Sequence, residues 1–173
     1  MVVKATYDTW GTFGQYRKCY VILTDGTYID PKEFTRGTWR GDVVEEEIEV
    51  GGKKYTVVIY NKDSRKNFHR TVEVPEEIAL ARVCEERTSG GWRGIKVVWG
   101  EGDIESEVVE EEWEDERYVY SKRVRVYKYV NERLGYEIPL VKFELEFRRE
   151  LKAEAKPKVV LTFLSRRGKL EAS

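Results

Sequence analysis

Side chains able to carry out covalent or metal chemistry are few in this sequence. It has one histidine, His69, in the polar stretch 61–70, and two cysteines, Cys19 and Cys84, each among apolar neighbours. A structural zinc site takes four His or Cys ligands, and a nucleophilic triad needs a histidine beside its nucleophile. We therefore expect a solvated loop histidine and two buried thiols, with a disulfide as the alternative in a thermophile. We expect no catalytic residue, no metal and no cofactor.

A tryptophan followed by arginine and glycine occurs twice, in glycine-rich stretches. The two copies are Trp39-Arg40-Gly41 and Trp92-Arg93-Gly94, and the polar stretch 61–70 adds further basic and aromatic residues: Lys62, Arg65, Lys66, Phe68 and Arg70. On loops, such pairs stack on exposed bases and contact phosphates. This pattern predicts single-stranded nucleic-acid binding as an alternative function. The other interpretation is that the tryptophans fold back and plug the ends of a sheet, since Trp is mostly buried in proteins.

Tyrosines gather on one predicted strand: Tyr118, Tyr120, Tyr127 and Tyr129. Side chains alternate along a strand, so the first two point to one face and the last two to the other. Tyr is enriched at interface hot spots, although cross-strand packing within the sheet explains it as well. We accordingly expect a non-catalytic accessory or structural protein that acts through a protein partner or through self-association. No small-molecule ligand can be identified.

Acids and bases alternate on three successive predicted strands, at Glu105-x-Glu107, Lys122-Arg123-x-Arg125 and Glu144-x-Glu146. This arrangement resembles the triphosphate tunnel metalloenzymes, whose closed barrel binds Mg²⁺ through Glu and triphosphate through Lys and Arg. The resemblance implies a phosphohydrolase with Glu144 and Glu146 as metal ligands and with Arg123 and Arg125 as phosphate-binding residues. The N-terminal Glu-x-Glu-x-Lys signature of that family is missing here. A solvated sheet face with ion pairs is the other interpretation.

Charge is dense and balanced over the 173 residues, with 31 basic and 32 acidic side chains and only one glutamine and three asparagines. Dense balanced charge with few thermolabile amides is typical of hyperthermophile proteins. No apolar run has the length of a membrane span, and the N-terminus lacks the apolar block of a signal peptide. We expect a cytoplasmic protein. Because no linker-like stretch occurs, we expect a single domain over 1–173, with a polar basic tail at about 165–173.

Two similar segments, 42–49 and 107–114, are each predicted to form the first strand of a β-hairpin. The pair Gly51-Gly52 predicts a two-residue turn that sets Ile48 opposite Tyr55. For the second hairpin we predict the turn Asp115-Glu116, with Trp113 opposite Tyr118. The similarity of the two segments leads to the hypothesis of an internal duplication of a hairpin unit.

Other turn signals and periodicities complete the predicted fold. Asp25-Gly26 predicts a hairpin with Leu23 opposite Tyr28, and Pro31 begins a short helical turn at 31–34. Pro75 and two following acids predict the one long helix, at about 75–87. Strict alternation predicts a half-buried strand at 140–151, and a last strand is expected at 158–164. The fold class is mainly β (α+β at most), an antiparallel β-sandwich or partly open barrel of about 8–10 strands with this one helix.

Overall fold

The computed structural model describes residues 1–39 and 41–152. It is mainly β and antiparallel throughout, which confirms the predicted fold class. The chain forms two compact units. Unit 1 consists of Met1–Glu105 and Lys128–Ile138, and unit 2 consists of Ser106–Tyr127 and the chain from Pro139 on. Each unit is described by itself below.

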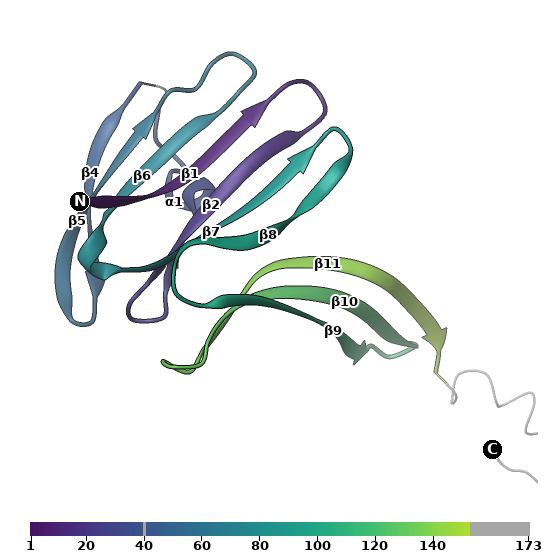
Figure 1. Ribbon diagram of the computed structural model, residues 1–173. Helices are drawn as coiled ribbons and strands as arrows, with labels where there is room; N and C mark the ends of the chain where they lie inside the picture. Colours follow the sequence, from purple (N-terminus) through teal and green to yellow (C-terminus); the bar gives the residue numbers. More distant parts are fainter. Residues whose placement is uncertain (40, 153–173) are drawn as a thin grey trace, which may run out of the picture. The chain divides into compact units, whose positions relative to one another are not determined.

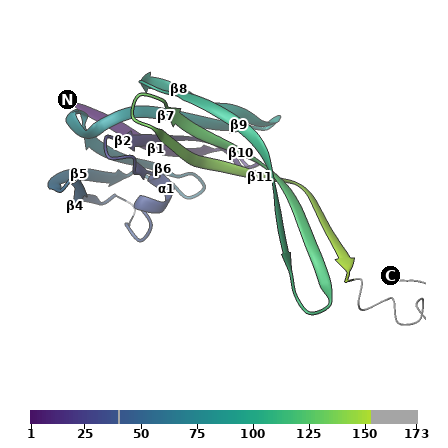
Figure 2. The same ribbon diagram turned by 90° about the horizontal axis from the view of Figure 1, so that it is seen from below.

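Eleven strands and two short helical segments make up the described residues (Figures 1 and 2). In chain order they are β1 (Val2–Trp10), β2 (Gln15–Leu23), β3 (Tyr28–Ile29), α1 (Pro31–Phe34), β4 (Val43–Val50), β5 (Lys53–Asn61), β6 (His69–Pro75), the 3₁₀ turn η1 (Glu76–Ile78), β7 (Ala79–Thr88), β8 (Gly91–Gly100), β9 (Asp103–Glu114), β10 (Tyr118–Asn131) and β11 (Tyr136–Leu151). Seven strands of the larger sheet lie in the order β4-β5-β6-β1-β2-β7-β8, and β3 pairs with β2. The smaller sheet has the order β11-β10-β9.

Unit 1 buries the apolar face of its sheet. Val3 lies opposite Val74, and Ile59 lies opposite Val72, and all four are fully or almost fully buried in one core cluster. β1 and β2 pair from Thr6 to Trp10, whereas further along β2 pairs with β3. The sheet therefore opens between β1 and β2 and bends around the core without closing into a barrel.

Helix α1 packs against β1, β2 and β6 (Figure 2). Its residue Phe34 contacts the core cluster. Asp30 caps it, because its Oδ1 accepts hydrogen bonds from the backbone N–H of Lys32 (2.9 Å) and of Glu33 (3.4 Å). Pro31 occupies the first turn, where no N–H donor is needed. The predicted helical turn at 31–34 is confirmed.

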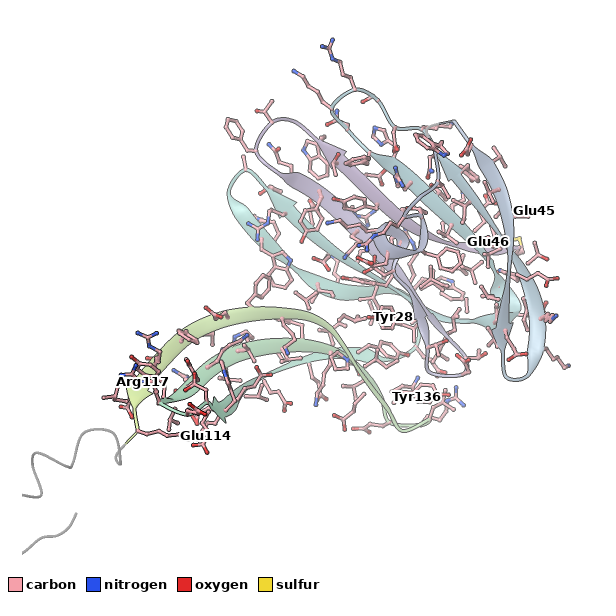
Figure 3. All side chains as sticks on the ribbon, turned by 180° about the vertical axis from the view of Figure 1, so that it is seen from behind. Tyr28, Glu45, Glu46, Glu114, Arg117 and Tyr136 are labelled. Carbon is pink, nitrogen blue, oxygen red and sulfur yellow. A yellow bond between two sulfur atoms is a disulfide. The ribbon has the colours of Figure 1, made fainter. Side chains whose placement is uncertain are left out.

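The β4–β5 hairpin has the predicted register. Ile48 lies opposite Tyr55, and Glu49 lies opposite Lys54. Gly51 and Gly52 have φ of 60° and 82°, the positive values that a two-residue primed turn requires. β4 is an edge strand and carries exposed glutamates on both of its faces, among them Glu45 and Glu46 (Figure 3).

Two other predicted hairpin registers are wrong. Ile22, and not Leu23, lies opposite Tyr28, because Leu23 N donates to Thr27 O and closes a three-residue loop. Gly26 takes the positive φ of 88° that such a loop places at its last position. A dipeptide signal locates the turn, but it does not fix the loop length.

In the β9–β10 hairpin the turn lies one residue later than predicted. Asp115 N donates to Tyr118 O, and Asp115 Oδ1 accepts from the N–H of Arg117 (2.9 Å) and of Tyr118 (2.8 Å). Asp115 therefore caps the turn and does not occupy its centre. As a result, Trp113 contacts Tyr120 in place of the predicted Tyr118.

The helix predicted at 75–87 is wrong. Only Glu76–Ile78 is helical, as one 3₁₀ turn, and Ala79–Thr88 forms strand β7 between β2 and β8. Its buried side chains lie on both faces: Cys84 on one, and Ala81, Val83 and Glu85 on the other. A strand covered on both sides has no polar–apolar alternation, so its pattern could not be told from that of a helix. Pairing on both edges then outweighs local helix propensity.

Cys19 and Cys84 form a disulfide, so the expectation of two free thiols is wrong, although both residues are buried as expected. They lie directly opposite each other on β2 and β7, 65 residues apart in the sequence. The misassignment of β7 as a helix concealed this pairing, because a helix offers no cross-strand neighbour.

Strand β11 contains the predicted strand 140–151. Phe143 contacts Tyr127, whereas Phe147 contacts Tyr120. The two tyrosines are an odd number of residues apart on β10 and the two phenylalanines an even number apart on β11, so one of the two strands departs from regular alternation between these contacts. Leu145 and Phe147 are about half exposed, so the strand is less buried than predicted.

The strand predicted at 158–164 and the basic tail at 165–173 lie outside the described residues. The single-domain and duplication predictions stay predictions. Among the described residues, no helix combines the length and the apolar character needed to cross a membrane.

Candidate binding sites

An aromatic cluster lies on one face of the unit 2 sheet. Trp113 of β9 stacks on Tyr120 of β10, with ring centroids 5.4 Å apart and an interplanar angle of 10°. Phe147 of β11 contacts both rings, at 6.1 and 6.2 Å. Tyr118 adjoins Tyr120 at 6.2 Å and carries the Arg149 guanidinium 4.3 Å above its ring. We call Trp113, Tyr118, Tyr120 and Phe147 the Trp113 cluster.

The turn between β9 and β10 holds this cluster in place. Tyr120 Oη donates a hydrogen bond of 2.7 Å to Asp115 Oδ2, while two backbone N–H groups bind Oδ1. The hydrogen bond from Tyr120, followed by those from the two N–H groups, lowers the pKa of Asp115 to about 2. The same bond raises the pKa of the Tyr120 hydroxyl. The turn carboxylate therefore stays charged and fixes the orientation of the Tyr120 ring.

The four predicted interface tyrosines are divided between different surroundings. Tyr118 and Tyr120 belong to the Trp113 cluster, and Tyr127 is half-buried against Phe143. Tyr129 is fully buried in unit 1, where its hydroxyl donates to Glu101 O (2.7 Å) and accepts from Asn131 Nδ2 (3.1 Å). Tyr129 is therefore not available at the surface.

Sequence reasoning missed Trp113 and Phe147 as surface residues. Their side chains are 44% and 51% exposed. The predicted hairpin sets Trp113 opposite Tyr118, and the alternation at 140–151 places Phe147 on a half-buried strand, so neither pattern predicts an exposed ring. One signal was present: Trp113 is the only aromatic residue in an otherwise acidic strand, where a buried ring would have few apolar neighbours.

A second candidate lies in unit 1 around Phe68. Phe68 stacks on Tyr7, with centroids 6.2 Å apart and an interplanar angle of 23°. Two cavities of about 260 and 310 Å³ share these two rings in their walls. Lys32 and Arg36 line the first cavity, and Lys66 lines the second. We call them the Phe68 cavities.

The cations around Phe68 are not equally available. Arg70 lies 5.2 Å from the Phe68 ring, but it is bound to Asp63 Oδ2 (2.5 Å) and to Thr35 O (2.8 Å), so it positions the ring. Arg36 forms an exposed ion pair with Glu33. Of the predicted nucleic-acid residues, Lys66, Phe68 and Arg70 come together here.

The remaining predicted nucleic-acid residues are placed elsewhere. Lys62 and Arg65 are exposed on the same loop but do not line these cavities. Trp39 is 77% exposed on a loop of unit 1. Trp92 and Arg93 lie on β8 and not on a loop, with Trp92 half-buried and Arg93 exposed. Arg40 lies outside the described residues.

A buried carboxylate lies between β2, β7 and β8. Glu85 is 3% exposed, and its Oε1 accepts from Tyr16 Oη (2.6 Å) and from Trp92 Nε1 (3.4 Å), while Oε2 accepts from Tyr20 Oη. Burial, together with Glu85 itself, raises the pKa of Tyr16 and of Tyr20, so both hydroxyls stay protonated donors. Three neutral donors thus replace the water around this carboxylate. In the sequence Glu85 is one acid in a run of charged residues, and nothing distinguishes it.

The tunnel arrangement implied by the resemblance is wrong. β9, β10 and β11 form an open sheet, and the strands that the structure describes form no closed barrel. Glu144 forms an ion pair with Lys122, and Glu146 forms one with Arg123, both at 3.8 Å. These contacts match the other interpretation, a solvated sheet face with ion pairs. Among residues 1–39 and 41–152 no group of three or more His, Cys, Asp or Glu side chains could hold a metal ion. His69 is partly exposed at the start of β6 and lies 3.1 Å from Asp8 Oδ1.

Comparison with known proteins does not add a second line of evidence to this geometry. The chain matches no protein-family profile, no curated protein and no solved structure.

Proposed function

We propose that this protein is a non-catalytic assembly protein whose copies associate through the Trp113 cluster. The observation that carries the proposal is the exposure of Trp113 and Phe147, whose rings pack on each other and on Tyr120 yet remain about half open to solvent. Large aromatic side chains held in fixed orientations are typical interface anchors, because little side-chain entropy is lost when they are covered.

Charge on the same sheet favours a second copy as the occupant of this surface. β9 is acidic, with six glutamates and Asp103, whereas β11 carries Arg148 and Arg149 near its end, followed by Glu150. A two-fold arrangement of two copies sets the acidic β9 of one sheet against these two arginines of its partner. The net charge of −1 adds almost no repulsion between copies.

Sedimentation equilibrium or light scattering after size exclusion tests this proposal. The wild-type chain should form a dimer or a larger assembly that dissociates on dilution. The double variant Trp113→Ser with Phe147→Ser should be monomeric. Trp39→Ser is the matched control, because it removes a more exposed tryptophan from unit 1 and should leave association unchanged. A monomeric wild-type chain, or equal loss of association in the control, would contradict the proposal.

Single-stranded nucleic acid is a second candidate ligand, favoured by the Phe68 cavities. The Tyr7–Phe68 stack offers a ring surface for a base. Lys32 in the wall of one cavity and Lys66 in the wall of the other offer charge for phosphates. Fluorescence anisotropy of a labelled single-stranded oligonucleotide over a salt series is the test. Phe68→Ala should weaken binding at every salt concentration, and Lys66→Gln should reduce the slope of log K against log salt by about 1. Lys62→Gln, on the same loop but outside the cavities, is the control. Absence of binding at low salt would exclude this function.

The source and location proposed with this function are the cytoplasm of a hyperthermophile. Cross-strand ion pairs such as Lys122–Glu144 and Lys142–Glu111 support the first part. The Cys19–Cys84 disulfide supports both together, because intracellular disulfides are common in hyperthermophiles and rare in other cells. Calorimetry tests the source: a melting temperature above about 90 °C is expected, and a value in the mesophile range would contradict it.

A further inference from the structure

A cavity of about 380 Å³ lies over the strands that carry the disulfide, in a part of unit 1 that takes no part in the proposed assembly. Cys84 is in its wall, together with the three cations Arg17, Arg93 and Lys96. The register explains this grouping. Cys84 lies opposite both Cys19 and Lys96, and Arg17 precedes Cys19 by two residues, so these side chains share one face of the sheet.

The cavity has a positive balance of charge. Arg17, Arg93 and Lys96 are exposed, and none of the ion pairs found between described residues involves them. Two glutamates are also in the wall. The carboxylate of Glu85 is bound by Tyr16 and Tyr20, whose side chains lie on the opposite face of the sheet, which leaves Glu86 as the one acid beside the three cations. A small anion in this cavity therefore meets a net attraction.

The two sulfur-bearing residues differ in access. Cys19 is fully buried, whereas Cys84 is 6% exposed and belongs to the cavity wall. Thiol–disulfide exchange requires the attacking thiolate to reach one sulfur while the other leaves. Attack from this cavity is therefore directed at Cys84 Sγ, and Cys19 is the leaving group.

We propose that this cavity is a binding site for small anionic thiols that reduce the Cys19–Cys84 disulfide. The thiolate of the first molecule attacks Cys84 Sγ, forms a mixed disulfide with it and breaks the Cys19–Cys84 bond. Cys19 leaves as a thiolate and takes up a proton. A second thiolate attacks the sulfur of the bound thiol, which frees Cys84 and releases the oxidised dimer of the small thiol. Two electrons pass from the two small thiols to the protein.

Opening this bond would release a crosslink between two central strands. Each cysteine is followed at once by a residue of the buried carboxylate group, Cys19 by Tyr20 and Cys84 by Glu85. The crosslink therefore holds the alignment in which the Tyr20 hydroxyl meets Glu85. Reduction at this site therefore makes the alignment of β2 with β7 depend on the concentration of small thiols around the protein.

The test compares thiols of different charge on the intact, oxidised chain. Glutathione carries a net negative charge, 2-mercaptoethanol is neutral and cysteamine is positive. Freed cysteines are trapped by alkylation and counted by mass spectrometry, and each rate is divided by the rate of the same thiol on a small uncharged disulfide. Glutathione should have the highest normalised rate and cysteamine the lowest. The double variant Arg17→Gln with Lys96→Gln should slow glutathione by about tenfold and leave 2-mercaptoethanol unchanged.

A surface-matched control and two further outcomes decide the result. Lys53→Gln, on the exposed end of β5, should not alter any rate, and added salt should remove the advantage of glutathione. Equal normalised rates for all three thiols would overturn the proposal, because they would show that reduction follows opening of the whole sheet. So would alkylation of both cysteines before any reductant is added.

Discussion

Trp113 stacks on Tyr120 at 5.4 Å, and the Tyr120 hydroxyl donates a hydrogen bond to Asp115, the residue that caps the turn between their two strands. The aromatic surface is therefore fixed by a polar contact at the end of its own hairpin. This relationship joins the proposed interface to a group whose charge can be titrated.

Replacing Tyr120 by Phe should release the Asp115 carboxyl. The pKa of Asp115 is lowered to about 2 in the folded chain, chiefly by the Tyr120 hydroxyl, against about 3.9 for an unfolded aspartate. A lowered folded pKa stabilises the fold above the unfolded value, and this stabilisation is lost as the pH falls from about 4 to about 2. In Tyr120→Phe the pKa should rise toward the ordinary value. Carboxyl NMR titration measures it, with Tyr118→Phe as the control, and an unchanged pKa would contradict the assignment.

Removing the Glu85 carboxylate should destabilise unit 1. In Glu85→Ala the hydroxyls of Tyr16 and Tyr20 lose their common acceptor, and we expect a loss of about 3 kcal/mol in the free energy of unfolding. Chemical denaturation gives the value. Glu86→Ala, one residue along the strand and half-exposed, should change it by less than about 0.5 kcal/mol. Equal effects at the two positions would show that the tyrosine contacts contribute nothing specific.

Two glycines with nearly the same backbone angle should respond differently to alanine. Gly37 and Gly100 have φ of 87° and 86°, so each substitution adds backbone strain of about 1 kcal/mol. A Cβ at Gly37 meets nothing within 4 Å, whereas at Gly100 it would lie 2.3 Å from the Leu80 carbonyl oxygen. Gly100→Ala should therefore shift the β7–β8 pairing and cost several kcal/mol more than Gly37→Ala in thermal or chemical unfolding. Similar losses would mean that β8 can move away from β7.

Removing the Cys19–Cys84 crosslink should lower the free energy of unfolding, whether or not the cavity beside it binds thiols. The disulfide closes a loop with a sequence separation of 65 residues, for which the chain-entropy estimate is about 4 kcal/mol. The double variant Cys19→Ala with Cys84→Ala should lose about this amount in chemical denaturation. The reduced wild-type chain should unfold at nearly the same midpoint. A double variant as stable as the oxidised wild type would show that β2 and β7 stay paired in the denatured chain.

Local rules predicted those features of the fold that depend on local residues. The Gly51-Gly52 turn fixed the register of β4 and β5 because two adjacent positive-φ positions admit one loop length. Glu46 is the one acid on the apolar face of β4, and its exposure follows from the edge position of its strand. Asp25 and Asp115 marked turns correctly, yet each register was wrong. At Asp25 the dipeptide did not fix the loop length, and Asp115 caps its turn and does not occupy the centre.

Long-range pairing decided the rest. The segment Ala79–Thr88 has the composition of a helix, but hydrogen bonds to β2 and β8 make it a strand, and only that assignment brings Cys84 to Cys19. The surroundings of the candidate site residues depend on long-range pairing for the same reason. Tyr127 and Tyr129 are two residues apart on one strand, and yet one lies in unit 2 and the other in the interior of unit 1. Tyr7 lies on β1 and Phe68 on the loop before β6, 61 positions apart in the sequence. No periodicity in the sequence predicts their contact.

The row of glutamates on edge strand β4 has a consequence for handling the protein in acid. Unpaired backbone groups on such an edge are a template for fibrils, and here charge is what keeps other chains away from it. A barrier made of carboxylates disappears on protonation, and the neutral strand then combines β-branched residues with a free edge. We therefore expect a colloidal stability limit set by pH, with turbidity and amyloid-dye fluorescence rising in acid before the fold is lost. Lysines in place of Glu45 and Glu47 should preserve clear solutions there.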